Sequence, residues 1–170
     1  MAELTPRDRL QPSLLDRLTD HAPETGRETF EQQTLGLLQL RQAVLRDLAW
    51  LLNTTNMAAT EDLTATPLAM KSTINFGVPG LAGNIGTANR LGAIEAGIAD
   101  AIRAFEPRIR ADTLKVRLRP SGDDKPTPSL VFEIRGELWA QPVPQQLFLE
   151  TSIELETRMA VITDVRGGTR

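Results

Sequence analysis

The stretch TANRLGAIEAGIADAIRAFEPRIRADTLKVRLR, residues 87–119, decides the fold class because its hydrophobic period changes once. Up to Phe105 the apolar residues recur at helical spacing, which predicts an amphipathic helix. Pro107 disfavours helical backbone at Glu106, so this helix is expected to stop near Phe105. From Leu114 onwards apolar and basic residues alternate, which is typical of a half-buried strand. A helix followed by strands predicts an α+β chain.

The same alternation returns in two stretches further along the chain. Residues 130–140 and 147–159 each alternate apolar with polar side chains, which brings the number of predicted strands to three. Clean alternation predicts an antiparallel sheet with one solvated face. On that face the first strand is basic, the second mixed and the third acidic. A spatial order of one, two, three would therefore let the middle strand pair with both neighbours.

A second helix is predicted at 35–53, where leucines and a valine recur at intervals of three, four and seven. Gly92 and Gly97 interrupt the first helix, at a cost of up to about 1 kcal/mol each relative to Ala. Such small residues would allow close packing on a neighbouring element. The predicted fold is α+β, with two main helices packed on one face of a three-stranded antiparallel sheet.

The chain divides by composition into an arm, one domain and a tail. Residues 1–34 are polar and predict a mobile N-terminal arm with one short helix capped by Ser13; a fully disordered arm is the alternative. Residues 35–160 form the domain, and 161–170 are expected to be a flexible tail. Within the domain, residues 54–86 have no sustained period, and so long an irregular segment is usually functional.

Composition excludes several classes of function. The chain has 170 residues, is 41% hydrophobic and 24% charged, and carries a formal net charge of −3, without the basic excess of a nucleic-acid-binding protein. It has no Cys and a single His, His21, which excludes disulfides, thiolate chemistry and multi-His metal sites. No apolar stretch predicts a transmembrane span or a signal peptide, so we expect a cytoplasmic protein without direct membrane insertion.

The sequence signals for catalytic residues are weak. Glu106 with Asp112, or Glu61 with Asp62, could supply two carboxylates, but neither spacing is specific. Aromatic residues make up only 4% of the chain and Tyr is absent, so there is little to stack on sugar rings. The glycines of 77–86 lack the strand and the Gly-Lys-Ser/Thr of a phosphate loop. We therefore predict no catalytic residue, no cofactor and no metal.

The tripeptide Glu106-Pro107-Arg108 is the most distinctive charged motif. It lies in the stretch 103–119, which holds six basic and two acidic residues. The pattern alone favours a solvated helix end, where cations interact well with the helix dipole. One alternative is a rigid docking corner, in which Pro107 fixes the turn and an exposed Arg108 offers a planar fork to a partner's carboxylate or carbonyl. The other is structural, with Arg108 paired internally with Glu106 or with a carboxylate of the sheet.

Several stretches together resemble the TssE family, a baseplate subunit of type VI secretion systems. Glu106-Pro107-Arg108 is similar to the hallmark tripeptide of the wider contractile-phage baseplate family, often labelled lysozyme-like. Phe76 stands where the family usually has Tyr, and Gly80 where an acidic residue is common. The resemblance covers roughly residues 10–160, and its other motifs are PSLLDRLTD at 12–20, VLRDLAWLLNT at 44–54 and STINFGVP at 72–79.

The resemblance implies an α+β fold and a structural role without catalysis. It implies a baseplate at the cytoplasmic side of the inner membrane, with the TssF and TssG wedge subunits, the TssB–TssC sheath and, as a further candidate, TssK as partners. The chain would initiate sheath polymerisation, and addition of a partner strand to the sheet edge is a physically suitable route. A peptidoglycan hydrolase and a small regulatory adaptor are the alternatives. The predicted partner-binding residues are Glu106, Pro107 and Arg108 on the wedge side, and Glu150, Glu154 and Glu156, which would favour a basic arm.

Overall fold

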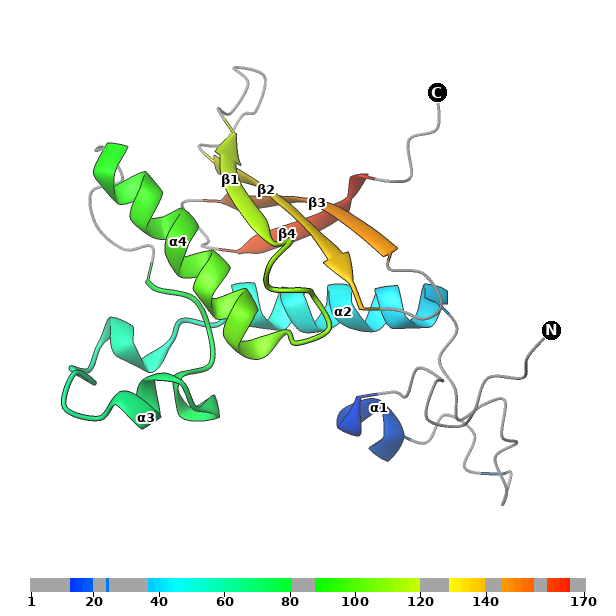
Figure 1. Cartoon of the computed structure of the whole chain (residues 1–170), viewed down its shortest axis with the longest axis horizontal. Helices are drawn as coiled ribbons and strands as arrows, with labels where there is room; N and C mark the ends of the chain where they lie inside the picture. Colours follow the sequence, from blue (N-terminus) through cyan, green and yellow to red (C-terminus); the bar gives the residue numbers. More distant parts are fainter. Residues whose placement is uncertain are drawn as a thin grey trace.

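Two long helices lie against one face of a four-stranded antiparallel sheet (Figure 1). The predicted α+β class is thereby confirmed. The computed structural model of the chain describes residues 13–19, 24, 37–80, 88–119, 129–139, 145–154 and 159–165. Most of the expected arm and the segments 120–128 and 140–144 lie outside these residues.

The long helices are α2 (Leu37–Leu52) and α4 (Ala88–Phe105), close to their predicted bounds. In α2, Val44 and Leu48 are fully buried on the face that the leucine spacing indicates. Each helix thus buries its apolar stripe and leaves its polar side to solvent. The helix α4 ends at Phe105, as Pro107 predicts.

The shorter helices precede or connect the long ones. They are α1 (Leu14–Leu18), η1 (Met57–Ala59), α3 (Pro67–Met70) and η2 (Thr73–Asn75). The predicted cap of α1 is confirmed, because the Ser13 hydroxyl accepts a hydrogen bond from the Asp16 amide at 3.4 Å.

The sheet has the spatial order β1-β2-β3-β4, with every neighbouring pair antiparallel. On its outer face, Arg119 Nε lies 3.2 Å from a Glu133 carboxylate oxygen and Arg119 Nη1 lies 3.7 Å from Glu150. Oppositely charged neighbours thus join three strands, as the charge pattern suggested. The strands are β1 (Lys115–Arg119), β2 (Ser129–Leu138), β3 (Gln145–Glu154) and β4 (Ala160–Asp164).

The prediction of three strands is wrong, because a fourth strand follows the third one. The predicted strand 147–159 ends as β3 at Glu154, and a fourth strand pairs back on it, with Ala160 opposite Ile153. Residues 155–159 contain no Gly, Pro, Asn or Asp to mark a turn, while their apolar alternation continues. The expected flexible tail is wrong for residues 161–164, which belong to β4.

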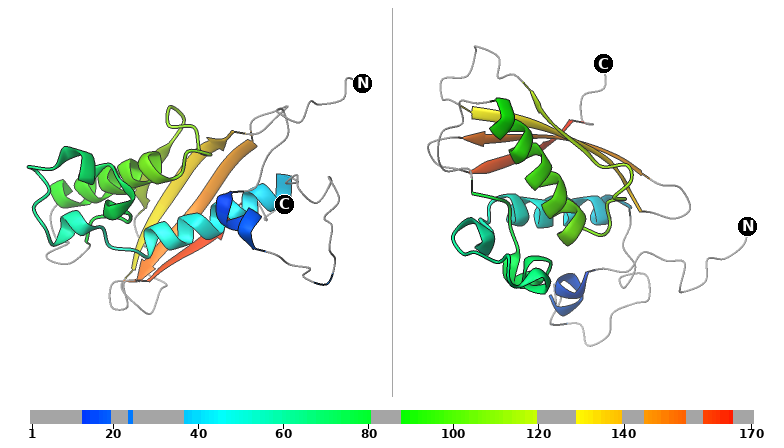
Figure 2. Two further views of the ribbon diagram at one scale, coloured as in Figure 1. Left: turned by 90° about the horizontal axis from the view of Figure 1, so that it is seen from below. Right: turned by 60° about the vertical axis from the view of Figure 1, so that its left-hand side comes forward.

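The two helices share the inner face of the sheet side by side. The helix α4 packs under β1 and α2 under β4, and the helices also touch each other. Figure 2 shows this two-layer arrangement, with the outer face of the sheet left open. The core between the layers is apolar and includes Leu48, Ile102, Phe132, Ile134 and Leu149, each 0% exposed.

Candidate functional site

The motif Glu106-Pro107-Arg108 forms a tight corner where α4 ends. The Glu106 amide still donates to the Ile102 carbonyl at 2.9 Å, after which the chain turns. The corner is then fastened to the end of β2, because the Trp139 amide donates to the Arg108 carbonyl at 2.7 Å. A second bond, 2.9 Å long, runs from the Arg110 amide to the Glu137 carbonyl. Main-chain bonds on both sides therefore make the corner rigid.

The Arg108 side chain is held within the chain. Its Nε donates to Glu106 Oε1 at 2.6 Å, and one terminal nitrogen donates to an Asp47 oxygen of α2 at 2.5 Å. The Glu106 side chain is only 3% exposed and that of Arg108 22%. The expectations of a solvated helix end and of an exposed Arg108 are wrong, and the alternative of an internal pair with Glu106 is confirmed, because Arg108 is the counter-ion of a buried carboxylate.

The ion pairs continue from this corner to the N-terminal helix. Asp47 also accepts a hydrogen bond from Arg46 Nε at 2.8 Å, and Arg46 in turn pairs with Asp16 of α1. We call the five residues Asp16, Arg46, Asp47, Glu106 and Arg108 the charged cluster; it joins α1, α2 and the corner after α4.

Contacts within the charged cluster shift the pKa values of Arg108 and Asp16. Burial by itself would lower the pKa of Arg108, but the hydrogen bond and charge of Glu106, followed by those of Asp47, outweigh burial and raise it. The Arg46 guanidinium lowers the pKa of Asp16 below its usual range, more than burial raises it. Both effects favour the charged forms of Arg108 and Asp16.

Of the acidic residues predicted on the third strand, Glu150 is the one whose side chain the structure describes. Glu150 lies on the outer face of β3, within reach of Arg119. The backbone of Glu154 closes β3, but its side chain lies outside the described part of the structure, as does the whole of Glu156. Among the predicted partner-binding residues that the structure describes, Glu150 is therefore separate from Glu106, Pro107 and Arg108.

Asp16, Arg46 and Asp47 were not predicted as site residues. On the helical spacing of α2, Arg46 and Asp47 fall mostly on the polar side, which pattern alone assigns to solvent. The available signal was their position inside the motif at 44–54, while Asp16 lies inside the motif at 12–20.

The segment after α2 is compactly folded rather than structureless. A parallel bridge joins Thr55 to Val78, and the buried Asn75 side chain ties the Ala58 amide to the Met70 carbonyl. Gly77 has φ of +125°, and a Cβ there would lie 2.4 Å from the Thr54 carbonyl oxygen. These contacts hold the motif at 72–79 against the domain.

Phe76 links this segment to the end of α4. Its ring meets Phe105 edge to face, with centroids 5.2 Å apart. A Tyr hydroxyl at this position is therefore not needed for the ring to pack at the corner.

Other candidate chemistry gains no support from the described residues. Asp112 is paired with Arg110 on the surface, and Glu61 and Asp62 are exposed neighbours on a loop. Within the described ranges, no three His, Asp or Glu side chains gather as metal ligands would. No helix among them is long and apolar enough to span a bilayer.

The fold and the charged corner define a small α+β domain whose helix α4 ends in a rigid, ion-paired turn. The sequence profile of the family described as baseplate wedge protein gp25 matches residues 38–143, more than half of the chain. The chain therefore belongs to the baseplate wedge protein gp25 family, which includes the TssE subunits. A search of curated protein sequences finds no significant match.

Proposed function

We propose that this chain is a structural subunit of a type VI secretion baseplate, which joins the TssF–TssG wedge and initiates polymerisation of the TssB–TssC sheath. Its family supports a baseplate role, and the motifs at 12–20, 44–54 and 72–79 favour the type VI system. The baseplate would lie at the cytoplasmic side of the inner membrane, with TssK as a further neighbour. The observation that carries the sheath-initiating step is the outer edge of β4.

The other edge of the sheet, at β1, is occupied by the chain itself. The helix α4 packs beside β1, and Glu95 of that helix accepts a hydrogen bond from the Leu118 amide at 2.5 Å. A strand added here would have to displace this carboxylate and the helix. Covering an edge with a helix and a charge is a usual protection against unwanted pairing.

Among the described residues, the Asn53 side chain covers the outer edge of β4 at the start of the strand. The Asn53 side chain accepts from the Ala160 amide at 2.8 Å and donates to the Ala160 carbonyl at 3.0 Å, so both Ala160 groups point away from β3. Backbone directions alternate along an antiparallel strand, so the amide and carbonyl of Ile162 also point outward. No further strand lies beyond β4 in the described part of the chain. An incoming sheath strand could use these groups.

The charges near this edge suggest a basic incoming strand. Glu150 lies on the neighbouring strand β3 and is only partly offset by Arg119, 3.7 Å away. Glu154 and Glu156 would add to this negative charge. Main-chain bonds would supply affinity and these carboxylates would favour one register.

We place the wedge contact at the corner. Pro107 is exposed and Arg108 keeps part of its surface, while Glu106 and Asp47 fix the guanidinium in one orientation. The nitrogen left for a partner's carboxylate or carbonyl is Arg108 Nη1, which is buried and has no hydrogen-bond partner among the described residues. A group held in one orientation loses little entropy when it binds. Glu106 is then a positioning residue and Arg108 the docking residue.

Copurification with TssF–TssG from cells tests the wedge contact. We expect the wild-type chain to copurify with TssF–TssG. The amount of the Arg108→Ala variant that copurifies should be lower by about tenfold or more, and Arg108→Lys should restore only part of the wild-type amount. Arg103→Ala is the matched control, because Arg103 is an exposed arginine on the same helix end, paired with Asp100. Equal recovery of the Arg108→Ala and Arg103→Ala variants, with both folded, would contradict the proposed contact.

We further propose that the role needs no catalysis. The Glu106 carboxylate, the first candidate general acid, is buried and committed to Arg108. The purified protein should leave the turbidity of a cell-wall suspension unchanged. Clearing that disappears in Glu106→Gln would instead favour the hydrolase.

A further inference from the structure

The basic stretch 103–119 is mostly neutralised in the folded chain. Arg103 pairs with Asp100 at 2.8 Å, and Arg110 with Asp112 at 2.6 Å. Arg108 pairs within the charged cluster, and Arg119 pairs with Glu133 at 3.2 Å. Two cations of the stretch remain, Lys115 and Arg117, which are exposed on the outer face of β1 and have no ion pair among the described residues.

The register of the sheet explains why these two cations stay unneutralised. Arg117 lies opposite Glu133, but that carboxylate is already bound by Arg119 and Arg135. Lys115 lies opposite Arg135 itself, which places like charges directly across two strands. Such a pair opposes folding of the isolated chain.

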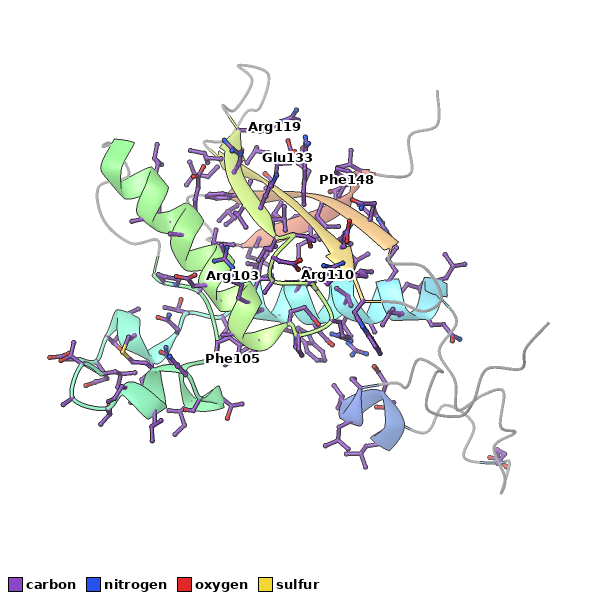
Figure 3. The ribbon with its side chains drawn as sticks, in the orientation of Figure 1. Arg103, Phe105, Arg110, Arg119, Glu133 and Phe148 are labelled. Carbon is purple, nitrogen blue, oxygen red and sulfur yellow. The ribbon has the colours of Figure 1, made fainter. Side chains whose placement is uncertain are left out.

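We propose that the outer face of β1 binds an acidic, extended segment of a partner protein through Lys115 and Arg117. Residues two apart on a strand lie roughly 6.5–7 Å from each other, because each residue advances the strand by about 3.3 Å. An extended segment with carboxylates on alternate residues has the same spacing. Arg119 and Arg135 flank the pair and both bind Glu133, so Lys115 and Arg117 carry the unpaired positive charge of the described part of this face. Figure 3 shows Arg119, Glu133 and Phe148 on this side of the sheet, away from α2.

A peptide fits this surface better than a nucleic acid does. Binding of single strands relies on aromatic rings that stack on bases. The aromatic ring of this face, Phe148, is covered by the Arg135 guanidinium, 5.4 Å from its centroid. The net charge of −3 also disfavours a long polyanion. The surface includes neither the β4 edge nor the corner, so it stands independently of the sheath and wedge contacts.

Fluorescence anisotropy with a labelled peptide of alternating Glu and Thr tests the proposal at low salt. We expect the full chain to bind this peptide, and the Lys115→Gln/Arg117→Gln double variant to bind about tenfold more weakly. The matched control is Lys71→Gln/Arg103→Gln, which removes two exposed positive charges elsewhere and should bind as wild type does. Affinity should fall steeply with added salt.

Three outcomes would overturn the proposal. The first is that a peptide of alternating Gln and Thr binds as tightly as the peptide of alternating Glu and Thr. The second is that the control double variant loses as much affinity as the test variant. The third is that a thymidine oligonucleotide binds more tightly than the acidic peptide. Circular dichroism of both double variants verifies that each is folded, since all four substitutions lie on exposed side chains.

Discussion

Arg108 has a structural role at the corner in addition to any docking role. Its removal leaves the Glu106 carboxylate, 3% exposed, without its nearest counter-ion. We expect Arg108→Ala to lower the free energy of unfolding by about 2–3 kcal/mol, less than for a fully buried pair because Arg108 is 22% exposed. Urea unfolding measures this, and a midpoint equal to that of the wild type would show that the pair is not structural.

Thr151 carries a buried hydroxyl for which no hydrogen-bond partner is found among the described residues. The residue is 1% exposed and lies between Phe132 and Ile162 across the sheet. Thr151→Val keeps the shape and removes the unsatisfied group, so it should raise the free energy of unfolding by about 1 kcal/mol. Thr163→Val, at an exposed site of β4, should change it by less than about 0.5 kcal/mol. A less stable Thr151→Val protein would imply an unseen partner for the hydroxyl.

Lys115 should lower the free energy of unfolding of the isolated chain. Lys115→Glu replaces a like-charge pair with Arg135 by an opposite-charge pair. The free energy of unfolding should rise by about 0.2–1 kcal/mol at low salt and the gain should shrink at high salt. Thermal melts at two salt concentrations measure it. A lower melting temperature at low salt would mean that these side chains do not face each other.

At the scale of elements, two glycines of α4 look alike in the sequence and differ in the fold. A Cβ at Gly97 would lie 2.6 Å from the Pro79 ring, whereas one at Gly92 would meet nothing within 4 Å. The predicted close packing is thus confirmed for Gly97 and wrong for Gly92. Gly92→Ala should stabilise the chain by up to about 1 kcal/mol, and Gly97→Ala should destabilise it. The two melting temperatures moving in the same direction would contradict this packing.

The contact between α1 and α2 should be lost at acid pH. Because Arg46 lowers the pKa of Asp16, their contact is fully present above about pH 4 and is lost as the pH falls through the lowered pKa. Arg46 also lies over the Trp50 ring, at 5.1 Å, so release of Asp16 should change the Trp50 emission. An acid titration of the Trp139→Phe variant, in which Trp50 is the remaining tryptophan, measures this change in Trp50 emission. Asp16→Asn is the control, and an identical acid transition in that variant would assign the change to another group.

At the scale of the whole molecule, the periodic helices and strands could be predicted from the sequence, whereas the turn before β4 and the contacts between distant residues could not. The stripes of α2 and α4 and the alternation of β1 and β2 are periodic, so their apolar faces were assigned from spacing alone. The turn before β4 was missed because no turn residue interrupts the alternation at 155–159.

The charged cluster could not be predicted from spacing. Asp16, Asp47 and Arg108 are far apart in the sequence and meet only when α1, α2 and the corner pack together. Local charge balance therefore assigned Arg108 to solvent, whereas the fold places it over a buried Glu106. The family resemblance indicated the importance of the corner, and the geometry supplied the reason for its rigidity.

Sheath assembly in cells that lack their own copy of this subunit tests the central claim most directly. Ile162→Pro removes an outward amide of β4 but no bond to β3, so the chain should still fold and copurify with TssF–TssG. We expect fluorescent TssB–TssC sheaths with the wild-type chain and with Ile162→Val, and almost none with Ile162→Pro. Sheaths at wild-type frequency with Ile162→Pro would contradict strand addition at β4, and equal numbers with and without the wild-type chain would contradict sheath initiation itself.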